Sequence, residues 1–164
     1  MASDFSSVTP SAVVLGAAAL FALFLTLTRR WADMSREHVS RLARIAVVTI
    51  LGQACHFAEE LAMGFHERFP ETFGLAPIPL AWFVSFNVAW LVIWVLSVLG
   101  LGTGSRAASF PLWFLGVACI LNGIAHPALS ALSGGYFPGL LTSPAVGVLG
   151  VLLLRSLFAV TVSG

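Results

Sequence analysis

The chain has 164 residues, of which 59% are apolar and 9% are charged, and its formal net charge at pH 7 is +1. Its mean hydropathy of +0.97 is far above that of water-soluble globular domains, which excludes a soluble enzyme or binding module. The charge is almost balanced and the chain has no lysine, so nucleic acid is not expected as a partner.

The apolar runs predict an all-α integral membrane protein. A spanning helix needs about 20 residues, so the length suits roughly four to six spans and leaves no room for a separate soluble domain. Breaks that contain arginine, glycine or proline divide the chain into about five transmembrane helices. We therefore expect one helical bundle domain over residues 1–164, with spans at about residues 10–28, 42–63, 80–101, 110–132 and 140–160.

The arginines predict the orientation of the chain. The first span is followed at once by Arg29 and Arg30, and the segment up to Arg44 holds most of the arginines. A secretory signal carries its positive charge before the apolar stretch, so this segment is expected to remain as a span. By the positive-inside rule the arginine-rich segment is cytoplasmic, which places the N-terminus outside and the C-terminus in the cytoplasm. Arg106 and Arg155 then also fall on the inner side.

The second span carries ionisable side chains that need a partner or a task, because a charged group is costly inside a bilayer. His56 is followed by Glu59 and Glu60, three and four residues later. Residues at these spacings lie on one face of a helix. One turn is therefore expected to present an imidazole beside two carboxylates.

Other polar residues are expected at the same depth. Asn122 and His126 stand four residues apart in the fourth span, and Asn87 lies in the third. At about 1.5 Å of rise per residue, His56, His126 and Asn87 lie roughly one and a half to two turns from the outer ends of their spans. The sequence thus predicts a polar pocket in the outer half of the bundle, lined in part by Asn87 and Asn122.

The outer connections add further polar residues. The stretch from His66 to Pro79 reads as a loop with prolines as breakers, and Glu67 as part of a solvated span end. The run from Tyr136 to Gly139 reads first as a turn set by proline and glycine. Its tyrosine is the only one in the chain, and a phenol above a carboxylate site could donate a proton.

Imidazole nitrogen and carboxylate oxygen suit zinc, iron or manganese, and helical bundles bind such metals with ligands that project inward. The expected ligands of a divalent metal, zinc or iron, are His56, Glu60 and His126. Glu59 and Tyr136 are expected as catalytic residues, the first to accept a proton and the second to stabilise developing charge. The alternative is structural: the two glutamates only hydrogen-bond polar residues of neighbouring spans.

With these residues in this order, the sequence resembles the HXXEE-domain family of small bacterial integral membrane proteins. That family has a His-x-x-Glu-Glu motif, a later histidine and a Tyr-x-Pro-Gly motif, and the resemblance covers most of the chain after Ile50. It implies a bacterial inner membrane and supports the choice of site residues, but it implies no particular reaction. The matching residues are His56, Glu59, Glu60, His126, Tyr136, Pro138 and Gly139.

Three classes of function stay open on this basis. The leading hypothesis is a membrane-embedded, metal-dependent enzyme, a hydrolase or an oxidoreductase, that acts on a lipid or another apolar small molecule. The second is a small-molecule binder or proton-coupled transporter that uses Glu59 and Glu60, although short spans without a repeat offer no two halves to alternate around a site. The third is a structural subunit or assembly factor. Membrane lipids and an apolar small molecule are the expected partners, and the chain could form a homo-oligomer.

Overall fold

The computed structural model describes residues 5–32 and 35–163, and over these residues it is almost entirely helical. The elements in chain order are η1 Phe5–Val8, α1 Thr9–Thr28, β1 Arg29–Trp31, α2 Arg36–Ala62, α3 Phe65–Glu71, α4 Leu80–Leu99, η2 Gly100–Thr103, α5 Arg106–Ser133, α6 Ser143–Ala159 and β2 Thr161–Ser163.

These helices confirm the all-α class. The last predicted span forms α6, which is apolar but has only 17 residues, so the count of five spans stays a prediction. Within the described ranges, four helical segments are long and apolar enough to cross a membrane, and they correspond to the first four predicted spans. They are Ser6–Thr28, Arg36–Ala62, Leu80–Thr103 and Ala107–Ser133.

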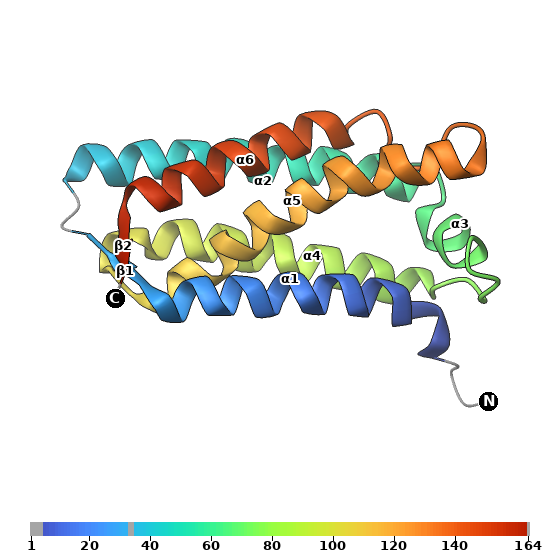
Figure 1. Cartoon of the computed structure of the whole chain (residues 1–164), viewed down its shortest axis with the longest axis horizontal. Coiled ribbons are helices and arrows are strands. Elements are labelled where there is room, and N and C mark those ends of the chain that lie inside the picture. Colours follow the sequence, from blue (N-terminus) through green and yellow to red (C-terminus); the bar gives the residue numbers. More distant parts are fainter. Residues whose placement is uncertain (1–4, 33–34, 164) are drawn as a thin grey trace.

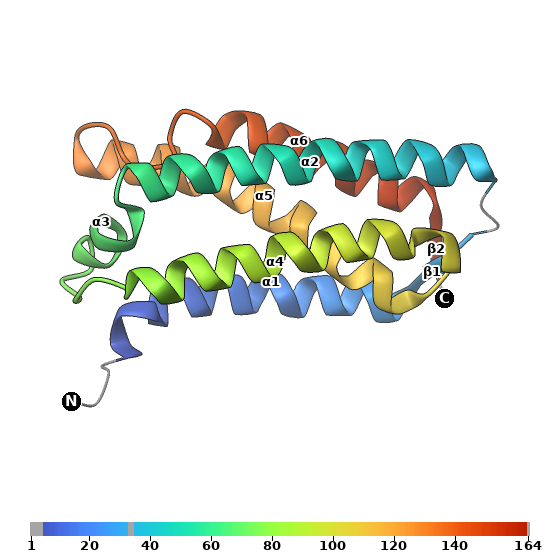
Figure 2. The ribbon, with the colours of Figure 1, turned by 180° about the vertical axis from the view of Figure 1, so that it is seen from behind.

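Helix α5 runs obliquely across the bundle and packs against α1, α4 and α6 (Figure 1). Helix α2 packs against α4 and α6. At one end of the bundle, which we call the α3 end, the last turns of α2 and α5 and the first turns of α4 and α6 gather near α3 (Figures 1 and 2). At the opposite end, the strand end, lie β1 and β2.

The connection between α2 and α4 contains a helix, which corrects the loop predicted between His66 and Pro79. Residues Phe65–Glu71 form α3, although Pro70 lies inside it. Proline has no N–H, and the carbonyl of His66 that it leaves free accepts a hydrogen bond from the amide of Ile78 at 2.8 Å. This bond folds the α3–α4 connection back against the end of the bundle.

Two short strands that the sequence analysis did not predict close the strand end. β1 pairs with β2 in antiparallel register, with Arg29 opposite Ser163. The Arg29 guanidinium donates to the hydroxyl and to the carbonyl of Thr161, both at 2.9 Å, and lies over the ring of Phe158. The residues that follow α1 are thereby joined to the residues that follow α6.

The arginines are distributed unequally between the two ends. The chain has eight basic residues, all arginine, and Arg68 in α3 is the one at the α3 end. The other seven arginines lie in the parts of their elements nearer the strand end: Arg29, Arg30, Arg36, Arg41, Arg44, Arg106 and Arg155. The predicted cytoplasmic side is based on this unequal distribution, and the orientation itself stays a prediction.

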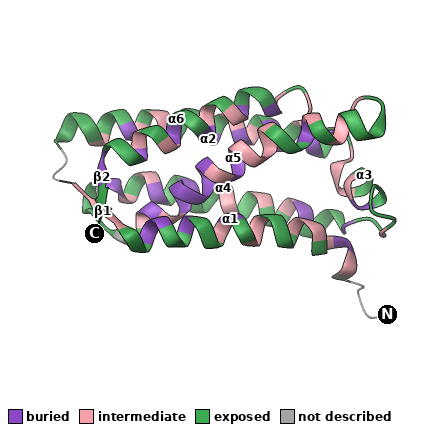
Figure 3. Ribbon diagram, viewed as in Figure 1, coloured by how far each residue is buried: buried purple, intermediate pink, exposed green. Residues whose placement is uncertain are grey.

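The buried core changes from apolar to polar along the bundle. Figure 3 shows the buried residues inside the bundle and the exposed ones on its outer faces. Toward the strand end the core consists of large apolar side chains such as Leu42, Trp113 and Leu153. Toward the α3 end the buried positions of α2 include four polar residues: Thr49, Gln53, His56 and Glu60.

Glycines bring α5 and α6 into close contact. A Cβ on Gly123 would lie 2.7 Å from the Cα of Gly147, and a Cβ on Gly150 would lie 2.7 Å from the carbonyl oxygen of Gly116. Small residues that let two backbones approach are typical of helix pairs in membranes. The close approach holds the α5–α6 connection, residues 134–142, against the end of the bundle.

Candidate metal centre

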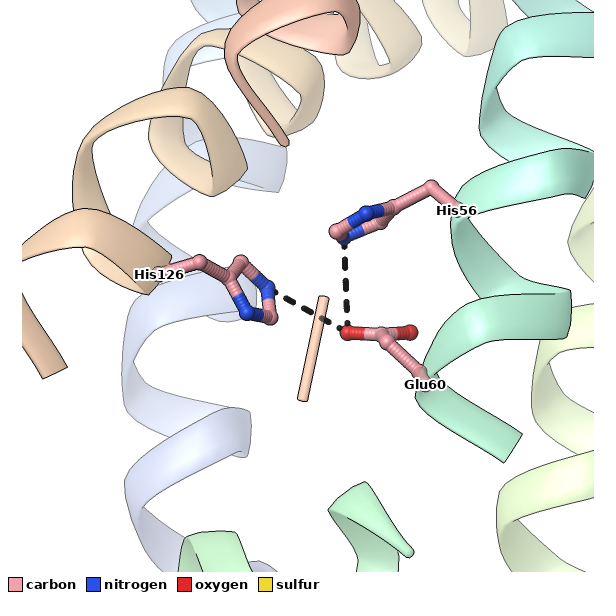
Figure 4. A group of neighbouring side chains, drawn as sticks. All are labelled: His56, Glu60 and His126. Atoms are coloured by element: carbon pink, nitrogen blue, oxygen red, sulfur yellow. Dashed lines mark ion pairs between the residues drawn. The ribbon is translucent and has the colours of Figure 1, made fainter. Parts of the chain in front are cut away.

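Two histidines and a glutamate meet inside the bundle near the α3 end (Figure 4). His56 and Glu60 come from α2, and His126 comes from α5. One carboxylate oxygen, Glu60 Oε1, lies 3.5 Å from His56 Nε2 and 3.3 Å from His126 Nε2. The residues are buried, with exposed fractions of 0%, 6% and 2% in chain order. Their ligand atoms lie within 4.8 Å of one another, so the group could hold a metal ion.

Aromatic rings and a glycine enclose these side chains. The centroid of the His126 ring lies 5.4 Å from that of Phe65 and 6.2 Å from that of Phe137. The two imidazoles are perpendicular, and their centroids are 4.7 Å apart. Gly139 lies against both of them, since a Cβ there would be 2.5 Å from His126 Cε1 and 2.8 Å from His56 Cε1. The centre is therefore closed by apolar groups, which strengthens the electrostatic interactions within it.

The 134–142 loop determines which ring nitrogen of His126 carries the hydrogen. His126 Nδ1 lies 2.6 Å from the carbonyl oxygen of Pro138. A carbonyl oxygen only accepts, so Nδ1 carries the hydrogen, and in the neutral ring Nε2 presents a lone pair. This Nε2 is the atom that faces Glu60.

Glu59 faces the same loop. Its carboxylate accepts four hydrogen bonds: from the hydroxyl of Tyr136 at 2.5 Å, from the amide of Leu141 at 3.0 Å, and from the amide and hydroxyl of Thr142 at 2.9 and 2.6 Å. Such charge-assisted bonds are the strong ones, and they tie α2 to the loop. Glu59 and Tyr136 thus lie together, and their expected catalytic roles stay predictions.

Thr142 connects Glu59 to His56. Its hydroxyl donates to Glu59, so only lone pairs remain for His56 Nδ1, which lies 2.7 Å away. Nδ1 of His56 therefore carries the hydrogen, and its Nε2 presents a lone pair. Within the described part of the chain, this buried Nε2 has no hydrogen-bond partner.

With both imidazoles neutral and the carboxylate ionised, three acceptor atoms face one another with no donor among them. They are the Nε2 atoms of His56 and His126 and the Oε1 atom of Glu60. Lone pairs that face each other in a buried site repel, whereas a cation between them attracts all three. The Nδ1 atoms of His56 and His126 each donate to a hydrogen-bond acceptor, as is usual for histidines that bind a metal through Nε2. The donor set fits a divalent metal such as zinc or iron.

Tyr136, which lies outside the long helices, should titrate late. Burial, followed by the hydrogen bond to Glu59, raises the pKa of its phenol from 10.0 to about 12. Because the pKa is higher in the folded chain, the stability that this bond contributes is fully present below about pH 10 and is lost as the pH rises through about 12. The chain has a single tyrosine, so a tyrosinate absorbance titration measures this group directly. We expect the measured pKa to fall toward the ordinary value in Glu59→Gln, and an ordinary pKa in the wild type would contradict the bond.

The two asparagines predicted for the pocket lie outside this group. Asn87, in α4, donates to the carbonyl of Phe83 in its own helix at 2.9 Å. Asn122 is half-buried in α5, about one turn before His126. Within the described residues, no hydrogen bond joins either amide to the three clustered side chains, and a pocket role for them stays a prediction.

Sequence reasoning missed the roles of three loop residues. Pro138 and Gly139 belong to the Tyr-x-Pro-Gly motif, which marked them only as a turn. Thr142 carries a weaker signal, since it is one of two adjacent hydroxyl residues, with Ser143, near the beginning of the last apolar run. The loop is therefore part of the site rather than a connection between helices.

Comparisons of the chain with protein-family models, with curated proteins and with solved structures give no match.

Proposed function

We propose that the protein is embedded in a membrane, binds a divalent metal through His56, Glu60 and His126, and uses this metal in a reaction on a lipid or another apolar small molecule. The observation that carries the proposal is the convergence of two imidazole lone pairs and a carboxylate oxygen in a buried site. Membership of the HXXEE-domain family is part of the same proposal and rests on the motif residues.

The outer faces of the long helices support the membrane location. Large apolar side chains lie exposed along them: Leu20 is 70%, Leu51 is 60% and Leu96 is 59% exposed. Apolar surface of this extent is unfavourable in water, whereas acyl chains cover it in a bilayer. The arginine asymmetry supports a cytoplasmic strand end. In this orientation the metal centre lies in the outer half of the membrane.

The number of ligands supports a catalytic metal. Structural zinc sites are usually closed by four protein ligands, whereas catalytic sites use three and keep one position open. Two histidines and one carboxylate are also the ligand set of many non-haem iron enzymes. A metal in this site would supply Lewis-acid activation for hydrolysis or a redox centre for oxidation. The chain itself holds both imidazoles by their Nδ1 atoms and keeps bulk water away.

A cavity at the α3 end supports access by a small molecule. It has a volume of about 240 Å³, and its wall includes Phe137, the residue whose ring packs on His126. The lining combines apolar Leu132 with charged Arg68 and Glu71. Phe137 thus borders both this cavity and the His126 ring, and we propose that its side chain moves to admit a small molecule, as side-chain and loop gates do in other enzymes.

Metal analysis of the detergent-purified protein tests the proposal. We expect stoichiometric zinc or iron in the wild type, a lower melting temperature after chelation, and loss of the metal in His56→Ala. His38→Ala is the matched control, because His38 is exposed in the same helix, and it should keep the metal. Substoichiometric metal in the wild type, together with a melting temperature that ignores chelators, would contradict the metal site. An activity on lipid or apolar substrates that persists without metal would contradict its catalytic use.

A further inference from the structure

We infer that Glu59 is a positioning residue for the metal ligand His56 and acts on it through the hydroxyl of Thr142. The consequence for metal binding rests on the proposed function. The effect on the His56 ring does not, because it concerns hydrogen bonds within the chain.

Glu59, Thr142 and His56 form one line of hydrogen bonds. Glu59 Oε2 accepts from the Thr142 hydroxyl at 2.6 Å, and the same hydroxyl oxygen lies 2.7 Å from His56 Nδ1. The amide of Thr142 also donates to Glu59 Oε2, at 2.9 Å, which holds the threonine in place without use of its hydroxyl. A hydroxyl has a single hydrogen, so donation to the carboxylate leaves its oxygen as an acceptor for His56.

The carboxylate therefore determines which nitrogen of His56 is free to bind. With the hydrogen on Nδ1, Nε2 presents its lone pair toward Glu60, 3.5 Å away. In the opposite tautomer, Nε2 would carry the hydrogen, would donate to Glu60 and could not bind a metal. A carboxylate commonly orients a histidine ligand by a direct bond, and here a threonine hydroxyl stands between the two.

The other histidine provides an internal comparison. His126 Nδ1 is held by the backbone carbonyl of Pro138, which no side-chain substitution at position 142 removes. A change at Thr142 should therefore alter the tautomer of His56 and leave that of His126 as it is. A general loss of structure would alter both.

Nitrogen-15 NMR of the imidazoles in metal-free, detergent-purified protein is the test, because the two tautomers differ in the chemical shifts of their ring nitrogens. The chain has four histidines, which single His→Ala variants assign. We expect the Nδ1–H form for His56 in the wild type and the Nε2–H form in Thr142→Val. The zinc affinity of Thr142→Val should fall about 10- to 100-fold. Thr142→Ser, which keeps the hydroxyl, should restore both the tautomer and the affinity.

Thr49→Val is the matched control. Thr49 is a fully buried residue of α2 whose hydroxyl donates to the carbonyl of Ile45 in its own helix. Its replacement removes a buried hydroxyl without a link to His56, so the His56 tautomer and the zinc affinity should stay at wild-type values.

Glu59→Ala keeps the inference testable if Thr142→Val does not fold. Without the carboxylate, the Thr142 hydroxyl has no acceptor at position 59 and can turn its hydrogen toward His56 Nδ1, which should then populate the Nε2–H form. His56 that stays entirely in the Nδ1–H form in both variants would overturn the inference, as would a Thr142→Ser protein that behaves like Thr142→Val. A protein with the expected tautomer change that binds neither zinc nor iron would refute the proposed function and leave this inference standing.

Discussion

Gly139→Ala is expected to abolish metal binding and to destabilise the fold by about 3 kcal/mol or more. The new Cβ would lie 2.5 Å from Cε1 and Nδ1 of His126 and 2.8 Å from Cε1 of His56, far inside van der Waals contact. The φ of Gly139 is +89°, a backbone conformation that other residues rarely adopt, so the loop cannot turn away without further strain. Both imidazoles would be displaced although neither is mutated.

Metal content and melting temperature in detergent measure this effect. Gly135→Ala is the matched control, because Gly135 lies in the same loop and a Cβ there would meet no atom within 4 Å. It should keep the metal and lose less than about 1 kcal/mol of stability. A Gly139→Ala protein that binds metal as the wild type does would show that the loop does not hold the histidines in the way described.

Glu60→Gln is expected to weaken metal binding by more than about 100-fold. Loss of a residue that only supports a metal ligand costs up to about 100-fold, and Glu60 is expected to bind the metal directly. The amide keeps the size of the side chain but removes its charge. It also offers N–H donors to two Nε2 atoms that already present lone pairs, so the variant can satisfy the site with hydrogen bonds instead of a metal. The apparent affinity can be measured by competition with a chromogenic chelator.

The matched control for this variant is Glu67→Gln at the α3 end. The Glu67 side chain is 65% exposed and lies 3.6 Å from His66, outside the three-residue group. Its replacement should leave the affinity within about twofold of the wild type, as is usual for an exposed side chain. An equal loss in both variants would mean that the effect comes from net charge at this end and not from a ligand.

The core of the site could be predicted from the sequence because helix geometry is regular. His56 and Glu60 are four residues apart, which places them on one face of any α-helix. His126 could be added because α2 and α5 run in the same direction, so residues at similar distances from the ends of these two helices lie at similar depth. Both steps need only the rise and the period of a helix.

The division of roles between the two glutamates could not be predicted in the same way. Glu59 and Glu60 are separated by about 100° around the helix axis, so they face different neighbours. The rotation of α2 about its axis is set by how its apolar residues, such as Leu42 and Ala46, pack in the core. Only with that rotation known does Glu60 face the imidazoles and Glu59 the loop.

The loop and the strands were unpredictable for a related reason. The position of Thr142 beside His56 depends on the path by which the chain returns from α5 to α6, and hydrogen bonds between distant residues define that path. Each strand has three residues, too few for an alternating pattern to show in a sequence. Tertiary contacts decide these features, and no local period reports them.

The hydrogen bonds of Glu59 also bear on how the protein is made. Helix α2 is the least apolar of the four long helices. The groups that bind the Glu59 carboxylate stand 77 to 83 positions further along the chain, so they leave the ribosome long after α2 does. In the proposed membrane location, α2 carries ionisable side chains that lipid does not tolerate well until these groups arrive. We therefore expect α2 to insert stably only after α5 and the following loop are synthesised. Insertion of this early helix would then depend on residues from the second half of the chain.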